Sequence, residues 1–238
     1  MSHSSSFQHE KDFEIGSFQV HPDGKIRLTS LADLFQETSW SHADSADFGR
    51  NLLENQQMWV LARLDFHCFD LPTWGQRVKV FTAGRGVEKL FAFREFLITD
   101  QDDKILAQCM SSYLLLNTES KRPMRPEVVL PAHLFDPLER PEWQPDKVKI
   151  QGELIAKELV RVRYSDLDLY DHVNNTSYIL WVENILREKG IDFSQFLINF
   201  QAECRLGDLV ELEMFQSQNE FLFQGKIGEK LVFLASAS

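Results

Sequence analysis

One stretch in the second half of the chain constrains the fold more than any other: a polar loop that runs directly into an apolar helix. The loop, residues 164–177, holds three acids, one histidine and several residues that favour the N-cap of a helix. In the helix that follows, apolar side chains recur at i, i+3, i+4 and i+7: Tyr178, Trp181, Val182 and Ile185. Neighbouring apolar residues widen this stripe, so the sequence predicts a helix at about residues 175–188 that is covered on most sides. Gly190 is expected just past its end.

Strand-like segments follow this helix, and the first half of the chain repeats the order. After the helix, β-type runs are expected at residues 200–204, 209–215, 220–226 and 230–235. In the first half, a helix capped by Thr29 or Ser30 ends near residues 42–45. The strands expected after it lie at residues 58–69, 77–83, 89–99 and 104–116. An antiparallel sheet that curls around a helix can bury it, so the sequence predicts an α+β protein with two similar units.

The remaining segments set the expected domain limits. Residues 1–12 are rich in serine, histidine and charge, which predicts a disordered tail before a first strand at residues 13–20. Six of the eight prolines and no glycine lie in residues 118–150, a composition typical of a semi-rigid connector. The expected organisation is one domain at residues 13–120, a connector at 121–150 and a second domain at 151–238.

Charge and cysteine content exclude several classes of function. The net charge of −11 is unfavourable for binding nucleic acid or an anionic membrane surface. Cys68, Cys109 and Cys204 are far apart and form no CxxC pair, which suits a reducing compartment and gives no zinc signature. Residues 1–12 contain no apolar segment of the signal-peptide kind, and no run of 18 apolar residues occurs, so we expect a cytoplasmic protein.

The polar loop combines groups that can serve catalysis. A nearby acid, a histidine and a helix N-terminus can together stabilise a developing oxyanion. A calcium site is excluded, because the sixth and twelfth loop positions counted from Asp166 are Asp171 and Ser177, where an EF-hand needs Gly and Glu. The seven histidines are scattered along the chain, and we expect neither a metal nor a cofactor.

These residues resemble the family of acyl-acyl-carrier-protein thioesterases. The second half is similar through Asp166-Leu167-Asp168, His172-Val173-Asn174-Asn175, Tyr178, Trp181 and Glu203-Cys204 before Gly207-Asp208. The first half is similar, in the family's order, through residues 34–38, 48–49, 59–63, 72–75 and 117–126. The resemblance covers roughly residues 13–235. It implies two tandem hotdog domains, each a long central helix wrapped by a curved antiparallel sheet, and cleavage of fatty acyl thioesters carried by acyl carrier protein.

The resemblance also implies site residues in the second half. The family's catalytic set is an Asp, an Asn two residues later, a His two after that, and a Glu-Cys pair on a later strand. Here the Asp is Asp168, the His is His172 and the pair is Glu203-Cys204. The position of the family's Asn holds Tyr170, which departs from the family pattern. The thioester carbonyl must then be polarised by the Tyr170 phenol, by Asn174 or by the backbone N–H groups at the helix start. The first half has no such loop, so it is expected to bind the acyl chain only.

The chemistry assigned to these residues is general-base hydrolysis. Glu203 is expected to activate water, His172 to share or relay the proton, and Asp168 to orient His172 or complete the water network. Cys204 has two open roles, a nucleophile with His172 as its base or a small buried residue beside the general base, and the second is favoured.

The last predictions concern the role of a basic cluster and the alternative functions of the chain. Lys121, Arg122 and Arg125 form the clearest basic cluster, which is expected either to meet an acidic carrier protein or to be a solvated connector face. Three alternative functions stay open: an acyl-CoA thioesterase of the same fold, a hotdog dehydratase, and a non-catalytic acyl-thioester-binding module. Both a monomer and a homodimer fit two tandem units.

Overall fold

The structure is a computed structural model that describes residues 6–46, 49, 51–130, 142–218 and 220–238. The chain forms two compact units. The first comprises residues 1–62 and 67–145, and the second comprises residues 63–66 and 146–238.

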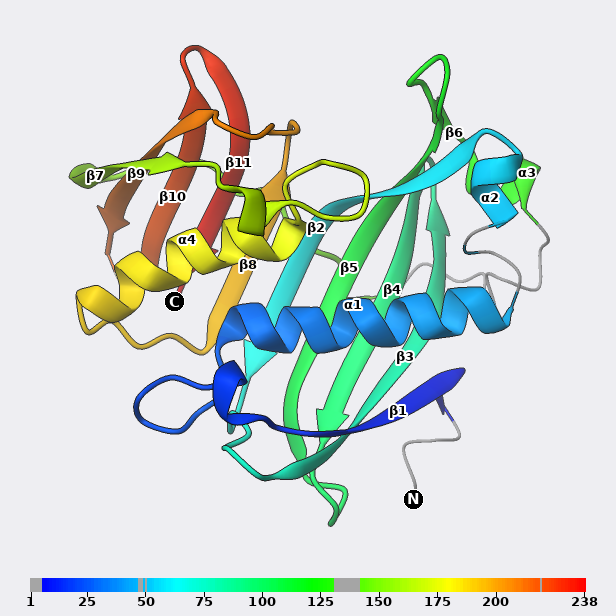
Figure 1. Ribbon diagram of the computed structural model, residues 1–238, viewed down its shortest axis with the longest axis horizontal. Coiled ribbons are helices and arrows are strands. Elements are labelled where there is room, and N and C mark those ends of the chain that lie inside the picture. Colours follow the sequence, from blue (N-terminus) through cyan, green and yellow to red (C-terminus); the bar gives the residue numbers. More distant parts are fainter. Residues whose placement is uncertain (1–5, 47–48, 50, 131–141, 219) are drawn as a thin grey trace. The chain divides into compact units, whose positions relative to one another are not determined.

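The first unit consists of a long helix and an antiparallel sheet. Its elements in chain order are β1 (His9–Glu14), the 3₁₀ turn η2 (Ser17–Gln19), α1 (Leu28–Ser45), α2 (Asn51–Glu54), β2 (Gln57–Cys68), β3 (Arg77–Glu88), β4 (Phe91–Thr99), β5 (Ile105–Asn117), β6 (Pro123–Met124) and α3 (Pro126–Val129). The strand order is β1-β3-β4-β5-β2, and β6 pairs with β5. Figure 1 shows α1 lying across the strands of this sheet.

The second unit has the same construction. Its elements are β7 (Glu153–Arg161), the 3₁₀ turn η4 (Tyr164–Asp166), α4 (Asn175–Glu188), β8 (Gln195–Phe200), β9 (Leu209–Ser217), β10 (Glu220–Ile227) and β11 (Lys230–Ala237). The strand order is β7-β9-β10-β11-β8, with antiparallel neighbours throughout. Figure 1 shows α4 lying across these strands.

The two strand orders are the same when the elements are counted within each unit. In both sheets the first strand pairs with the third, the third with the fourth and the fourth with the fifth, while the second lies beside the fifth. The predicted order of strand, helix and four further strands is confirmed, and the architecture is α+β. The strand expected at residues 200–204 was wrong: the strand is β8 at Gln195–Phe200, and residues 201–204 follow it outside any strand.

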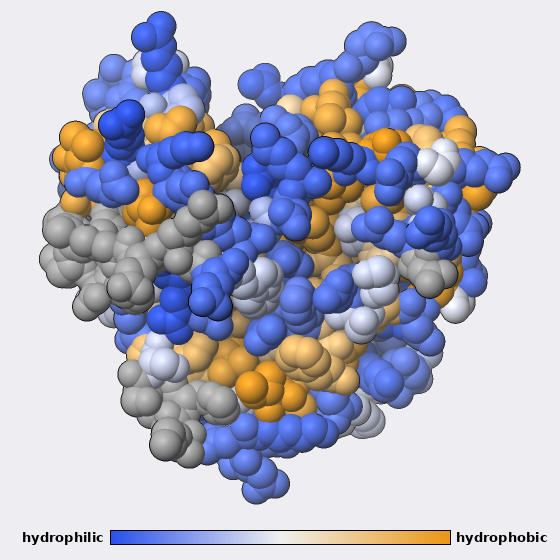
Figure 2. All heavy atoms as spheres, turned by 180° about the vertical axis from the view of Figure 1, so that it is seen from behind, coloured by the Kyte–Doolittle hydropathy of each residue, from blue (hydrophilic) through white to orange (hydrophobic). Residues whose placement is uncertain are grey.

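The surface mixes charged and apolar side chains. Figure 2 shows hydrophobic patches between hydrophilic residues on one face of the molecule. The large hydrophobic side chains with the greatest exposure include Leu169, Tyr164, Phe18 and Val128. Within the described residues, no helix has both the length and the apolarity needed to cross a membrane.

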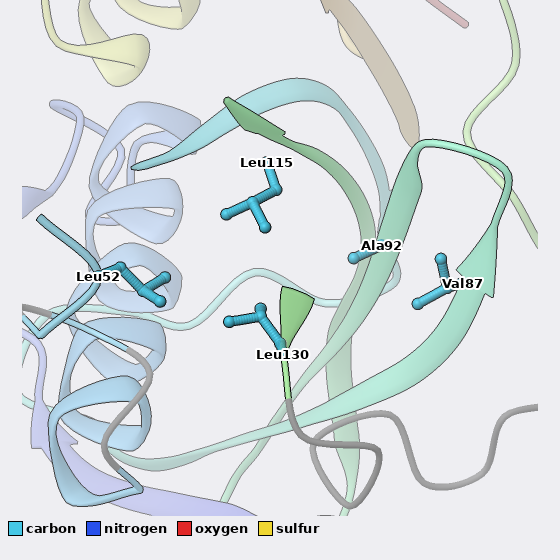
Figure 3. Close-up of a cluster of buried hydrophobic side chains, with 5 residues drawn as sticks. All are labelled: Leu52, Val87, Ala92, Leu115 and Leu130. Atoms are coloured by element: carbon cyan, nitrogen blue, oxygen red, sulfur yellow. The ribbon is translucent and has the colours of Figure 1, made fainter. Parts of the chain in front are cut away.

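Each helix buries its apolar stripe against its own sheet. In the second unit Ile179, Val182 and Leu186 of α4 have no exposed surface, as expected for a helix covered on most sides. In the first unit Phe35 of α1 stacks on Phe96 of β4 with ring centroids 5.0 Å apart. A further cluster of buried apolar side chains in the first unit is formed by Leu52, Val87, Ala92, Leu115 and Leu130 (Figure 3).

The prediction for the N-terminal segment was wrong. Residues 9–14, not 13–20, form the first strand, and β1 pairs with the edge of β3 from His9↔Thr82 to Glu14↔Arg77. An ion pair of 2.6 Å between Lys11 and Glu37 ties this strand to α1. The segment is polar because it covers a sheet edge, and pairing with a distant strand leaves no local apolar pattern. Residues 1–5 of the expected tail lie outside the described residues.

Candidate active site

The polar loop before α4 closes on itself through backbone hydrogen bonds. The N–H of Arg163 donates to the carboxylate of Asp166 over 2.7 Å. Leu167 and Val173 form an isolated antiparallel bridge. The N–H of Asp168 donates to the carbonyl oxygen of His172 over 2.8 Å. These contacts make residues 163–174 a defined loop with His172 near its end.

Asp168 holds the backbone of this loop through its carboxylate. Its Oδ1 accepts the N–H of Tyr170 at 2.8 Å and the N–H of His172 at 3.2 Å. Between them Asp171 adopts the left-handed conformation, with φ of 57°. The recorded contacts of Asp168 therefore fix the position of the His172 backbone and do not involve its imidazole.

The start of α4 is capped by Asn174, as the sequence predicts for this stretch. Its Oδ1 accepts the N–H of Thr176 at 3.2 Å, and its carbonyl oxygen accepts the N–H of Ser177 at 2.9 Å. Its own N–H donates to the carbonyl oxygen of Asp166 over 2.8 Å. Within the part of the chain that the structure describes, no acceptor is recorded for the N–H of Asn175, which leaves this first-turn donor available to a ligand.

Glu203 lies in the segment between β8 and β9, and its neighbours anchor that segment to β11. The N–H groups of Gln201 and Ala202 donate to the carbonyl oxygen of Val232 over 2.8 and 3.0 Å. The ammonium group of Lys230 donates to the carbonyl oxygen of Glu203 over 2.8 Å. The backbone that carries the Glu203 carboxylate is thus held to β11 by two residues, Val232 and Lys230.

The end of this segment adjoins the beginning of the polar loop. The N–H of Gly207 donates to the carbonyl oxygen of Val162 over 3.1 Å, and the N–H of Val162 donates back to Asp208 over 2.9 Å. The side chain of Asp208 also accepts the N–H of Arg205 over 2.8 Å. Two segments that are about 45 residues apart in sequence therefore lie side by side.

His172 and Glu203 meet where these segments adjoin. The Nε2 of His172 lies 3.6 Å from Oε2 of Glu203, an ion-pair distance somewhat longer than a hydrogen bond. The two side chains are 32% and 59% exposed, so water and a ligand can reach both. The imidazole and the carboxylate can share a water molecule, which is the arrangement needed for general-base chemistry.

Cys204 is buried and its backbone is anchored. The residue has no exposed surface, and its N–H donates to the phenol oxygen of Tyr178 over 3.2 Å. Burial raises the pKa of the Cys204 thiol, which disfavours the thiolate that a nucleophile requires. These observations favour the buried-residue role over the nucleophile. The contact with Tyr178 was not predicted, because a tyrosine in an apolar stripe gives no sign that its hydroxyl has a partner.

Tyr170 and the basic cluster are the remaining candidate residues. Tyr170 is 45% exposed, and its N–H is bound to Asp168. Lys121, Arg122 and Arg125 are exposed and belong to the first unit, whereas the His172–Glu203 pair belongs to the second. Within the described residues, no three His, Cys, Asp or Glu side chains are placed to hold a metal ion.

Comparison with known proteins identifies two consecutive matches to family models. The model of the acyl-ACP thioesterase N-terminal domain matches residues 6–130, and that of the acyl-ACP thioesterase C-terminal domain matches residues 151–230.

Curated plant relatives are longer than this chain. A chloroplastic acyl-[acyl-carrier-protein] hydrolase of Cuphea viscosissima is 25% identical over 84% of this chain and 53% of the relative. A chloroplastic dodecanoyl-[acyl-carrier-protein] hydrolase of Umbellularia californica is 28% identical over 82% of this chain and 56% of the relative. The chain therefore spans about half the length of these relatives.

Solved structures share the fold over the whole chain. An acyl-ACP thioesterase from Bacteroides thetaiotaomicron is 24% identical with a TM-score of 0.84, covering 100% of this chain and 99% of the other. The 12:0-ACP thioesterase from Umbellularia californica is also 24% identical, with a TM-score of 0.80 over 96% and 95% of the two chains.

Proposed function

The chain belongs to the acyl-ACP thioesterase family, and from this premise we propose that it hydrolyses fatty acyl-acyl carrier protein and releases the free fatty acid. The observation that carries the proposal is the approach of the His172 imidazole to the Glu203 carboxylate, at 3.6 Å, beside the start of α4. No cofactor takes part.

The proposed reaction uses Glu203 as a general base. Its carboxylate takes a proton from a water molecule as the water oxygen attacks the thioester carbonyl carbon. When the tetrahedral intermediate collapses, the carbon–sulfur bond breaks, and His172 relays the proton from Glu203 to the leaving thiolate, which regenerates the Glu203 carboxylate. General-base catalysis of this kind contributes a factor of roughly 10²–10⁴ to the rate.

The oxyanion of the intermediate needs hydrogen-bond donors. The N–H of Asn175 is the first-turn donor of α4 that the Asn174 cap leaves available. The phenol of Tyr170 and the amide nitrogen of Asn174 are the side-chain donors closest in sequence to His172. One well-placed donor is worth a factor of about 10²–10³ in turnover.

Within this proposal the two units are hotdog domains with different tasks. The first domain, expected at residues 13–120 and extended by β1, β6 and α3, binds the acyl chain, and the second, residues 151–238, carries the catalytic pair. The support is that each unit sets one long helix, of 18 residues in α1 and 14 in α4, against its own antiparallel sheet. We further propose a cytoplasmic protein that acts as a monomer or homodimer.

Lys121, Arg122 and Arg125 are the proposed contact for the acidic carrier protein. All three side chains are exposed: Lys121 and Arg122 lie in the turn that joins β5 to β6, and Arg125 directly follows β6. Charge reversal at Arg122 and Arg125 is expected to raise KM for the carrier-bound substrate and leave KM for a short thioester unchanged. Equal effects on both substrates would assign these residues to a solvated surface.

The decisive experiment measures thiol release from a panel of acyl chains, each presented on carrier protein and on CoA. The proposal expects release of thiol and fatty acid, with a higher kcat/KM for the carrier-bound substrates. A preference for CoA would indicate an acyl-CoA thioesterase. Binding without thiol release would indicate a binding module, and an enoyl product from a 3-hydroxyacyl thioester would indicate a dehydratase.

A further inference from the structure

The loops before the two helices share several backbone hydrogen bonds. His21 N–H donates to the Lys25 carbonyl over 2.8 Å, as Asp168 N–H does to His172 over 2.8 Å. The N-cap residues match as well: Arg27 N–H donates to the Gln19 carbonyl over 2.9 Å, and Asn174 N–H donates to the Asp166 carbonyl over 2.8 Å. The turn before the third strand is also shared, because Gly75 N–H donates to Ile15 in the first unit and Gly207 N–H donates to Val162 in the second.

These matches assign an equivalent residue to each member of the candidate site. Lys25 stands where the second unit has His172. Leu71 and Pro72 stand four and three residues before Gly75, as Glu203 and Cys204 stand before Gly207. His21 stands where the second unit has Asp168. The first unit therefore has similar turns without the His172 imidazole or the Glu203 carboxylate, and it joins them by bonds of its own, from Ile26 N–H to Pro72 and from Trp74 N–H to Gly24.

One further contact is present in the second unit and impossible in the first. Tyr178 lies four residues after its helix N-cap, and the residue four after the N-cap of α1 is Leu31. The Tyr178 oxygen accepts the Cys204 N–H, but Leu31 has no hydroxyl and Pro72 has no N–H. The first unit, which lacks the catalytic pair, therefore has neither the donor nor the acceptor of this hydrogen bond.

The Tyr178 hydroxyl is held rigidly in place. Its ring is 3% exposed and meets Trp181, Phe200 and Phe233 edge-on, with centroids 5.0, 5.8 and 5.5 Å apart. Three aromatic partners fix the ring independently of the hydroxyl, so the ring stays packed when the hydroxyl is removed.

We propose that Tyr178 is a positioning residue whose hydroxyl sets the approach of the Glu203 carboxylate to the His172 imidazole. Glu203 directly precedes the N–H that Tyr178 binds, and His172 lies two residues before Asn174, the N-cap of the helix that carries Tyr178. The hydrogen bond therefore links the two segments that carry the pair. The inference rests on the proposed function, since it assigns a role within the same site.

The first test is Tyr178→Phe, which removes one oxygen atom and keeps the ring. We expect kcat to fall about 10- to 100-fold with KM changed less than about twofold, because a small displacement of a catalytic group acts on the chemical step. The matched control is Tyr164→Phe, which removes the same atom from a side chain that is 80% exposed. A Tyr178→Phe enzyme with the kcat of the control would overturn the proposal.

A double-mutant cycle separates positioning from a general structural role. If Tyr178 acts through Glu203, adding Tyr178→Phe to Glu203→Gln should lower kcat by less than about twofold further. A second loss as large as the first would show that Tyr178 acts independently of Glu203, and the proposal would fail.

A third readout does not depend on activity. The ring signal of His172 in an NMR spectrum, assigned with His172→Gln, should shift in Glu203→Gln because the neighbouring carboxylate charge is removed. Tyr178→Phe should shift that signal in the same direction by at least half as much, and an unchanged signal would overturn the proposal. A wild-type protein that releases no thiol would reject the proposed function, whereas this signal would still decide the role of Tyr178.

Discussion

The loop before α1 and the loop before α4 share one backbone and differ in chemistry. The left-handed position is Gly24 in the first and Asp171 in the second, and both loops end at the N-cap of a long helix. The first places a lysine where the second places His172. The backbone is therefore specified by turns and caps common to both, and the catalytic side chains are an addition to a scaffold that forms without them.

At the C-terminal ends of α1 and α4 it is the first unit that carries the buried polar residues. In the first unit the buried guanidinium of Arg94 donates to Nδ1 of His42, on α1, and to the hydroxyl of Thr82, both over 3.0 Å. The position equivalent to His42 on α4 is the C-cap, Lys189, which is exposed. The first unit thus carries its polar network in its interior, and the second carries its candidate site at the accessible start of its helix.

The largest difference between the loops should appear in turnover. His172→Ala and Glu203→Gln are each expected to lower kcat by about 10²- to 10⁴-fold, because the proton acceptor or relay is lost. Lys25→Ala, the matched change in the first loop, should leave kcat within about twofold. The measurement is thiol release under saturating substrate, with circular dichroism to verify folding. Near-normal turnover of both second-loop variants would remove the pair from the mechanism.

The buried network of the first unit should appear in the pH dependence of stability. Burial, followed by the charge of Arg94 and then His9, lowers the pKa of His42 from 6.5 to about 4. The unfolded chain then takes up a proton before the folded one does, so the stabilisation is complete above pH 6.5 and is lost as the pH falls to about 4.

The test compares wild type with His42→Gln, which has no titrating ring. Between pH 7 and pH 4 the wild-type free energy of unfolding should fall by about 3 kcal/mol more than that of the variant. Urea unfolding at both pH values measures this difference. Parallel pH dependences would show that His42 does not drive the loss.

The role of Asp168 can be tested by separating its charge from its hydrogen bonds. Asp168→Ala leaves the N–H groups of Tyr170 and His172 without their acceptor, and kcat should fall about tenfold or more as the loop loosens. Asp168→Asn keeps an acceptor oxygen and should stay within about threefold of wild type. If Asn proves as damaging as Ala, the negative charge itself is required.

The smallest effect concerns the left-handed position of each loop. At Gly24, where φ is 81° and a Cβ would meet nothing within 4 Å, Gly24→Ala should cost about 1 kcal/mol from backbone conformation alone. At Asp171 the reverse change, Asp171→Gly, should stabilise by less than about 1 kcal/mol. Chemical unfolding of both variants measures the pair. Destabilisation by Asp171→Gly would show that its side chain contributes more than its backbone conformation costs.

Local signals account for what could be predicted about the second helix. The polar cap and the apolar stripe placed it at about residues 175–188, and the structure has Asn175–Glu188 with Asn174 as the cap. Gly190 has a φ of 66°, as expected for a residue just past the helix end. Each of these features depends on residues within a few positions of one another, so sequence order alone reveals them.

Contacts between distant segments could not be predicted in this way. The strand at His9–Glu14 exists because β3 offers an edge, and the hydrogen bond from Cys204 to Tyr178 joins residues 26 positions apart. Resemblance to a family pointed to His172 and Glu203 as candidates. Their separation of 3.6 Å depends on hydrogen bonds made by the Val162 backbone, the Val232 carbonyl oxygen and the Lys230 ammonium group, which the sequence does not display.

The sequence by itself determined the two long helices, the repeated order of elements and the loop that caps α4, because turns, caps and apolar periodicity act over short distances. The cap expected at Thr29 or Ser30 was wrong, since α1 begins at Leu28 with Arg27 as its N-cap. Only the tertiary structure decided that Glu203 faces His172, that Cys204 is buried and that Tyr178 links the two segments. The physical reason is that a site assembled from separate loops depends on how the sheet brings those loops together, and that is a property of packing over the whole unit.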